Sequence, residues 1–86
     1  MNINELIAII KNKLEKEVII QNLKIEDKSF LHKNHKGHKE GKFHLKLTIN
    51  SDELAQTSKI VSTKRIYNIL DLELKEHIHS IQILLN

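Results

Sequence analysis

The chain has 86 residues, which suits a single domain over residues 1–86, and its hydrophobic content of 40% is enough for one core layer. It contains no cysteine, which excludes disulfides, zinc ribbons and thiol nucleophiles and leaves histidine and carboxylate as metal ligands. The formal net charge is +3, but the sequence is rich in lysine, asparagine and isoleucine together, so the charge alone does not indicate nucleic-acid binding.

The aromatic content and the apolar runs exclude further classes. Two phenylalanines and one tyrosine are the only aromatic residues, which argues against the base-stacking platforms of single-strand-binding proteins. No apolar run approaches the roughly 18 residues of a membrane span, and the first residues lack a signal-peptide pattern. We therefore expect a soluble, cytoplasmic protein that does not contact a membrane.

The first predicted element is an amphipathic helix from Ile3 to Glu15. Asn2 and Glu5 have the spacing of a capping box, and apolar residues then recur at steps of three and four. The next predicted element is a strand from Val18 to Ile25, because a β-branched run is followed by alternating apolar residues.

A histidine-rich segment follows, from His32 to His44, and it holds four of the six histidines and both glycines. The connection is about sixteen residues long, and long connections in compact domains are usually functional or disordered. The stretch from Phe43 to Ile49 alternates strictly and predicts a strand with His44, Lys46 and Thr48 on its polar face. We expect the two strands to pair antiparallel.

The second half of the chain predicts helices and one more strand. A polar turn holds two helix caps, Ser51 and Ser58, and the helical pattern runs from Ser58 to Lys75. Its apolar spacing shifts near Tyr67, which indicates two short helices rather than one. The stretch from Ile78 to Leu85 alternates as a third strand.

These elements give the order αββααβ, or αββαβ if the middle helices are continuous. The predicted fold class is α+β, with a three-stranded mixed sheet and helices on one face. In the third strand, alternation places His79 on the same face as Ile81 and Ile83.

Several short motifs follow one another between Asp27 and Ile83. They are Asp27-Lys-Ser29-Phe-Leu-His32, His35-Lys-Gly37-His38, His44-Leu-Lys-Leu-Thr-Ile-Asn-Ser51, Tyr67, Leu70-Asp-Leu-Glu73-Leu74 and Ile78-His79-Ser80-Ile81. In this order and spacing they resemble the BolA-like family, and they span about two-thirds of the chain. Two departures reduce the basic, histidine-bearing helix face of that family: Ser62-Thr63-Lys64 replaces Arg-His-Arg, and Leu54-Ala-Gln56 replaces Phe-x-Gly.

The resemblance implies a fold similar to the class II KH domain and a function without catalysis. It implies that the protein is a monomer alone and pairs with a monothiol glutaredoxin around a bridging 2Fe-2S cluster, in iron–sulfur trafficking or iron regulation. Glutaredoxin and glutathione would supply thiolates. His79 and one of the loop histidines (His32, His35 or His38) would supply imidazole nitrogens. His32 holds the motif position, whereas His35 and His38 have the backbone freedom that Gly37 and Gly41 confer.

Each histidine also has a plainer interpretation. His79 on its own suits the edge of a core with a backbone hydrogen bond, and the loop histidines suit a solvated segment or an isolated divalent-metal site. His44 is a further candidate for the site, whereas His77 suits the end of a helix, where it complements the helix dipole. The lysines at 33, 36, 39 and 42 favour solubility or attraction of an acidic partner and glutathione carboxylates.

Nucleic-acid binding by a transcriptional regulator is the alternative, because the family is also described as regulatory and two adjacent helices suggest a helix-turn-helix. Its candidate contacts are Lys59, Lys64 and Arg65. Against it, the would-be recognition helix carries Asp71, Glu73 and Glu76, which repel phosphates. The chain also lacks the Gly-x-x-Gly of KH clamps. For an enzyme we find no nucleophile with an adjacent base and no phosphate loop.

Overall fold

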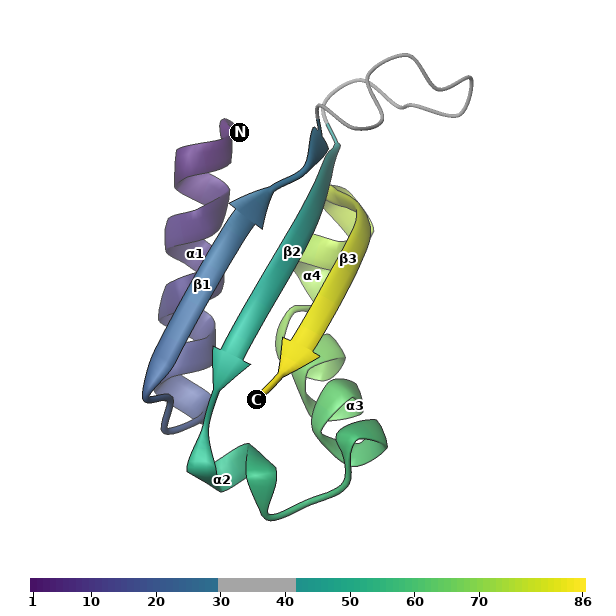
Figure 1. Cartoon of the computed structure of the whole chain (residues 1–86). Helices are drawn as coiled ribbons and strands as arrows, with labels where there is room; N and C mark the ends of the chain where they lie inside the picture. The colour runs from purple at the N-terminus through teal and green to yellow at the C-terminus, as the bar shows by residue number, and fades with distance from the viewer. Residues whose placement is uncertain (30–41) are drawn as a thin grey trace.

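A computed structural model of the chain describes residues 1–29 and 42–86, and the architecture is stated for these residues. They form a mixed α+β fold with a sheet on one side and helices on the other (Figure 1). The elements are α1 (Ile3–Glu17), β1 (Asn22–Asp27), β2 (Phe43–Asn50), α2 (Asp52–Ala55), α3 (Lys59–Ile69), α4 (Asp71–Glu76) and β3 (Ile78–Leu85). The predicted fold class is confirmed, with one short helix more than expected.

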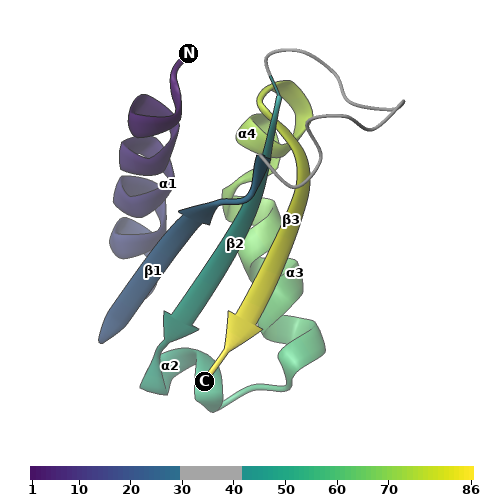
Figure 2. The ribbon, with the colours of Figure 1, turned by 45° about the horizontal axis from the view of Figure 1, so that its top comes forward.

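The three strands form one sheet in the order β1-β2-β3. β1 pairs antiparallel with β2, as predicted, and β2 pairs parallel with β3. A parallel pair needs a crossover connection, which α2, α3 and α4 provide on one face of the sheet. Figure 2 shows α3 and α4 behind β2 and β3, α1 on the β1 side of the sheet, and α2 at the end of the sheet near the C-terminus.

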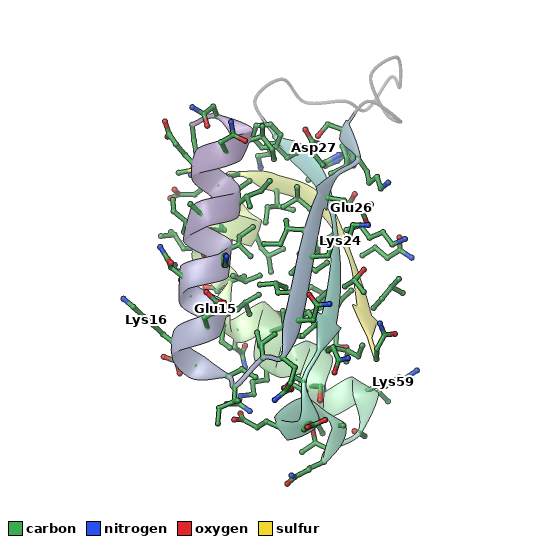
Figure 3. All side chains as sticks on the ribbon, turned by 60° about the vertical axis from the view of Figure 1, so that its left-hand side comes forward. Glu15, Lys16, Lys24, Glu26, Asp27 and Lys59 are labelled. Atoms are coloured by element: carbon green, nitrogen blue, oxygen red, sulfur yellow. The ribbon has the colours of Figure 1, made fainter. Side chains whose placement is uncertain are left out.

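The core lies between the helices and the inner face of the sheet, where apolar side chains fill the space beside α1 (Figure 3). α1 and β2 contribute the residues that their apolar periodicity predicts, whereas in α3 Ile60 and Val61 are exposed and Ser62 is buried. The fully buried side chains include Leu6, Ile10 and Leu14 of α1, Leu47 and Ile49 of β2, and Ile66 and Leu70 of the α3 region. The opposite face of the sheet has no helix over it among the described residues, and it carries Lys24 and Glu26.

The first strand begins four residues later than the predicted Val18. Val18 instead caps the end of α1, which extends to Glu17, and its side chain is buried in the core. At Ile19 the backbone bonds to side chains rather than to a neighbouring strand. Its N–H donates to the Glu53 carboxylate, and its carbonyl accepts from the Ser51 hydroxyl. The β-branched run is therefore a tethered link from helix to sheet.

The helical region confirms both predicted caps and the predicted break. The hydroxyl of Ser51 accepts from the backbone N–H of Leu54, and that of Ser58 accepts from Val61. Ser51 thereby starts the one-turn helix α2, where we predicted only a turn. The break between α3 and α4 falls at Leu70, three residues after Tyr67.

An ion pair joins α4 to α1. Lys13 Nζ lies 2.9 Å and 2.7 Å from the two carboxylate oxygens of Glu73, whose exposed fraction is only 4%. Our use of Glu73 as a surface charge that repels phosphates was therefore wrong, because this carboxylate faces α1 rather than solvent. None of the helices in the described part of the chain is long and apolar enough to cross a membrane.

Candidate functional site at one end of the sheet

The histidines of β2 and β3 meet at the end of the sheet where β1 ends and β2 and β3 begin (Figure 1). The Asp-x-Ser motif fixes the start of β2 at this end. The backbone N–H of Ser29 donates to the Asp27 carboxylate over 2.9 Å, which forms a tight turn, and the Ser29 hydroxyl accepts from the backbone N–H of His44 over 3.1 Å. The backbone N–H of Lys28 donates to the His44 carbonyl over 2.7 Å. Both backbone groups of His44 are thus held by residues 27–29.

A β-bulge brings His79 to His44. Phe43 pairs with Ile78 and His44 pairs with Ser80, so His79 is an extra residue on β3. Such a residue departs from the alternation of its strand. The predicted shared face of His79 and Ile81 is wrong for this reason. His79 is exposed and its ring contacts His44, whereas Ile81 packs half-buried against the core.

The three side chains Ser80, His44 and His79 form a hydrogen-bonded row that we call the histidine relay. The Ser80 hydroxyl lies 2.7 Å from Nδ1 of His44, and Nε2 of His44 lies 3.1 Å from Nδ1 of His79. The two rings stand nearly perpendicular, with centroids 4.7 Å apart and an interplanar angle of 83°. His44 is 4% exposed, so the row runs from a buried ring to an exposed one. Nε2 of His79 has no hydrogen-bond partner among the described residues.

The other histidines stand differently towards the relay. His32, His35 and His38 lie outside the described residues, as do the lysines at 33, 36 and 39, so their role stays a prediction. His77 ends α4 and is outside the relay, with Nε2 3.7 Å from a Glu76 oxygen. His44, a secondary candidate from the sequence, lies in the relay. His79 was interpreted as hydrogen-bonded to the backbone, but its ring bonds to the ring of His44 instead.

A metal held at His79 needs ligands from outside residues 1–29 and 42–86. Within residues 1–29 and 42–86, no group of three or more histidine, cysteine, aspartate or glutamate side chains is placed to hold a metal ion. The relay itself suits one ligand position. One ring nitrogen of His79 is oriented by a hydrogen bond and the other is available, which is the usual arrangement of a metal-binding histidine.

A cationic groove of about 360 Å³ adjoins the relay on the open face of the sheet. Lys28, Lys46, His44 and Ser80 are among its lining residues. Glu26 lies next to these lysines, 3.4 Å from Lys28 Nζ. Partial burial raises the pKa of this carboxyl, but Lys24, Lys28 and Lys46 outweigh that effect and hold the pKa below its ordinary value of 4.5. The lysine excess leaves the groove suited to anionic groups.

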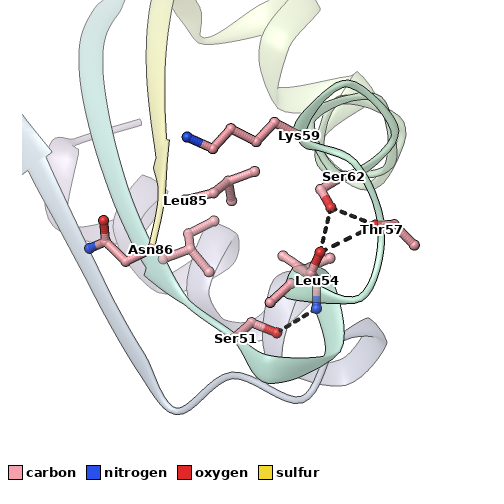
Figure 4. Close-up of a pocket in the computed structure, with 9 residues that line it drawn as sticks. Ser51, Leu54, Thr57, Lys59, Ser62, Leu85 and Asn86 are labelled. Atoms are coloured by element: carbon pink, nitrogen blue, oxygen red, sulfur yellow. Dashed lines mark hydrogen bonds between the residues drawn. The ribbon is translucent and has the colours of Figure 1, made fainter.

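A second hollow, of about 280 Å³, lies at the opposite end of the sheet, beside α2 and the C-terminus (Figure 4). Its polar groups bond to one another: the Ser62 hydroxyl donates to the Leu54 carbonyl over 2.9 Å and lies 2.8 Å from the Thr57 hydroxyl. Lys59 lines the hollow as well. Because its hydroxyls are already paired and it is remote from the relay, we do not assign the candidate site to it.

The three basic residues of the nucleic-acid alternative differ in how far the fold engages them. Arg65 is committed to the fold, because one guanidinium nitrogen lies 2.7 Å from Glu53 and another donates to the Glu17 carbonyl over 2.7 Å. The hydrogen bond from Arg65 also holds the pKa of the Glu53 carboxyl below its ordinary value. Lys59 and Lys64 remain exposed on α3. Two lysines are a small electrostatic footprint for phosphate binding.

Comparison with known proteins gives a consistent picture. The family model described as BolA-like protein matches residues 14–86. A curated relative, SufE-like protein 1, chloroplastic/mitochondrial, from Arabidopsis thaliana, is 34% identical over 79 residues. That alignment covers 86% of this chain, and the chain spans only 21% of the length of that relative.

Solved structures share the fold. The BolA domain of SufE1 from Arabidopsis thaliana matches with a TM-score of 0.77 and 31% identity, over 100% of this chain and 93% of that one. BolA1 from Arabidopsis thaliana matches with a TM-score of 0.76 and 27% identity, over 92% and 87%. BolA1 from Mus musculus, at 21% identity and a TM-score of 0.71 over 90% and 60%, supports the fold alone.

Proposed function

Because the chain belongs to the BolA-like protein family, we propose that it is a non-catalytic partner of a monothiol glutaredoxin, with which it shares a bridging 2Fe-2S cluster. Its role is in iron–sulfur cluster trafficking or assembly, or in iron regulation. We place it in the cytoplasm and as a monomer without its partner. His79 supplies one ligand and a loop histidine, first of all His32, supplies another. Glutaredoxin and glutathione supply thiolates.

The observation that carries this proposal is the position of His79. It is exposed at the end of a strand, and one ring nitrogen is engaged by His44 while the other has no partner among the described residues. An imidazole held in this way suits a mixed imidazole–thiolate shell, which raises the potential of a 2Fe-2S centre above that of an all-thiolate shell. Because the described residues supply only one ligand position at this site, a cluster shared with a second protein suits it better than one held by this chain alone.

The cationic groove beside the relay supports the same partner chemistry. Glutathione carries two carboxylates, and Lys28 and Lys46 line a groove that begins at His44. Lys42, one of the loop lysines to which we assigned this role, instead donates to the Lys75 carbonyl over 3.2 Å. We therefore assign the attraction of anionic groups to Lys28 and Lys46. Such attraction acts mainly on the rate of association.

The test is a visible circular dichroism titration. The protein is added to a cluster-loaded monothiol glutaredoxin homodimer with glutathione, and the signal of the cluster is followed. We expect wild type to replace the homodimer spectrum with a new one, and His79→Ala to leave the homodimer spectrum in place. His77→Ala is the matched control, because that histidine is two residues away but outside the relay. If wild type and His79→Ala both leave the homodimer spectrum unchanged, the proposal is wrong.

A further inference from the structure

We propose that His44 is a positioning residue for His79: Nε2 of His44 accepts a hydrogen bond from the N–H at Nδ1 of His79 and thereby selects the tautomer whose Nε2 is unprotonated and open to iron. The inference rests on the proposed function, because it assigns the atom through which His79 acts. It begins from the contact between Nε2 of His44 and Nδ1 of His79, which are 3.1 Å apart.

The proton positions along the relay follow from the chemistry of neutral imidazole. In each neutral ring one nitrogen donates and the other accepts. If His79 donates from Nδ1, then Nε2 of His44 accepts, so His44 carries its own proton on Nδ1. That proton points to the Ser80 hydroxyl, 2.7 Å away, which accepts it. In this arrangement each ring donates from Nδ1, His44 accepts at Nε2, and the ring acceptor left at the end of the row is Nε2 of His79.

The opposite arrangement blocks iron binding. If Ser80 donated to His44 and His44 donated to His79, Nδ1 of His79 would be occupied and Nε2 would carry the proton. Neither nitrogen would then offer a lone pair. An isolated neutral histidine in water prefers the proton on Nε2, which is this blocked form. A ligand role for His79 therefore calls for a neighbour that reverses the preference, and His44 is in hydrogen-bonding contact with the relevant nitrogen.

The fold holds His44 rigidly enough for this task. The residue is only 4% exposed, and its backbone N–H and carbonyl bond to Ser29 and Lys28 respectively. The bulge on β3 then places His79 and Ser80 both against this one ring. Because both ring nitrogens of His44 are engaged in the relay, His44 orients the ligand and is not the ligand itself.

The test reads the proton positions directly in the cluster-free protein. Long-range ¹H–¹⁵N correlation spectra of the histidine rings are recorded at about pH 8, where free imidazole is mostly neutral. We expect His79 protonated on Nδ1 in wild type and on Nε2 in His44→Leu. His44→Gln keeps an acceptor oxygen near the same place and is expected to retain Nδ1 protonation. Because a Leu at a buried position can unfold a protein, Ser80→Ala is a second variant, expected to give a mixture of the two forms.

A second measurement uses the same variants in the complex that carries the 2Fe-2S cluster. Loss of a hydrogen bond that orients a metal ligand typically costs 10–100-fold in affinity, so His44→Leu should release the shared cluster to a chelator about tenfold faster or more. His44→Gln should stay close to wild type. Protonation of His79 on Nε2 in wild type, or the same tautomer in wild type and His44→Leu, overturns the inference. The proposed function fails separately, through the response of the cluster to His79→Ala.

Discussion

Replacing Lys13 by Met tests the ion pair that joins α1 to α4. The Glu73 carboxylate is 4% exposed, and Lys13 donates to both of its oxygens, over 2.9 Å and 2.7 Å. Removing the ammonium leaves a buried acceptor without its partner, which costs about 1–3 kcal/mol. The 3–5 kcal/mol of a fully buried pair is too much here, because 37% of the Lys13 side chain is exposed and water can replace part of the contact.

The assay is urea unfolding followed by far-ultraviolet circular dichroism. Lys13→Met should lower the unfolding free energy by about 1–3 kcal/mol, and for a domain of this size each kcal/mol lowers the melting temperature by about 4–8 °C. Lys16→Met is the matched control, since Lys16 lies on the same helix and points away from the sheet (Figure 3). Its effect should stay within about 0.5 kcal/mol. The double variant Lys13→Met with Glu73→Leu should recover stability, because an apolar pair of similar volume is often neutral or better. Equal midpoints for Lys13→Met and Lys16→Met would refute the reasoning.

Other predictions concern single contacts. Ser29→Ala removes the acceptor for the His44 N–H and should cost about 1 kcal/mol, with faster amide hydrogen exchange at His44 as the measurable sign. The pKa of Glu53 is depressed in the folded state, so its stabilisation is present above the ordinary carboxyl pKa of 4.5 and is lost as pH falls through the lower folded pKa. Urea midpoints of wild type and Glu53→Gln should therefore converge under acid, and a constant gap would contradict this. Arg65→Ala should lower stability rather than affinity for DNA, whereas Lys64→Ala should reduce the salt slope of any DNA binding by about 1.

Local periodicity was enough to predict the elements whose structure depends on their own residues. α1 and β2 follow their apolar spacing, and Asn2, Ser51 and Ser58 cap helices as their side chains dictate. The strand prediction at Val18 failed because β-branched residues also suit an extended link. There the backbone is tied to side chains of a region more than thirty residues away, at Ser51 and Glu53.

The site was predicted only in part, because its geometry depends on register between strands. The alternation of β3 placed His79 with Ile81, and no local signal in the sequence announced the bulge that moves it to His44. Similarly, the acidic side chains of the last helix look equivalent in sequence. Only the tertiary structure distinguishes Glu73, which is buried and paired with Lys13 of α1, from the exposed Asp71.

Native mass spectrometry of the complex with glutaredoxin tests the central claim most directly. The protein, a cluster-loaded monothiol glutaredoxin and glutathione are mixed and the intact assemblies are weighed. We predict a heterodimer that contains one copy of each protein, one glutathione and one 2Fe-2S cluster. We expect that species to disappear with His79→Ala and to persist with His77→Ala. A cluster found only in the glutaredoxin homodimer, or a heterodimer that keeps its cluster with His79→Ala, would contradict the account.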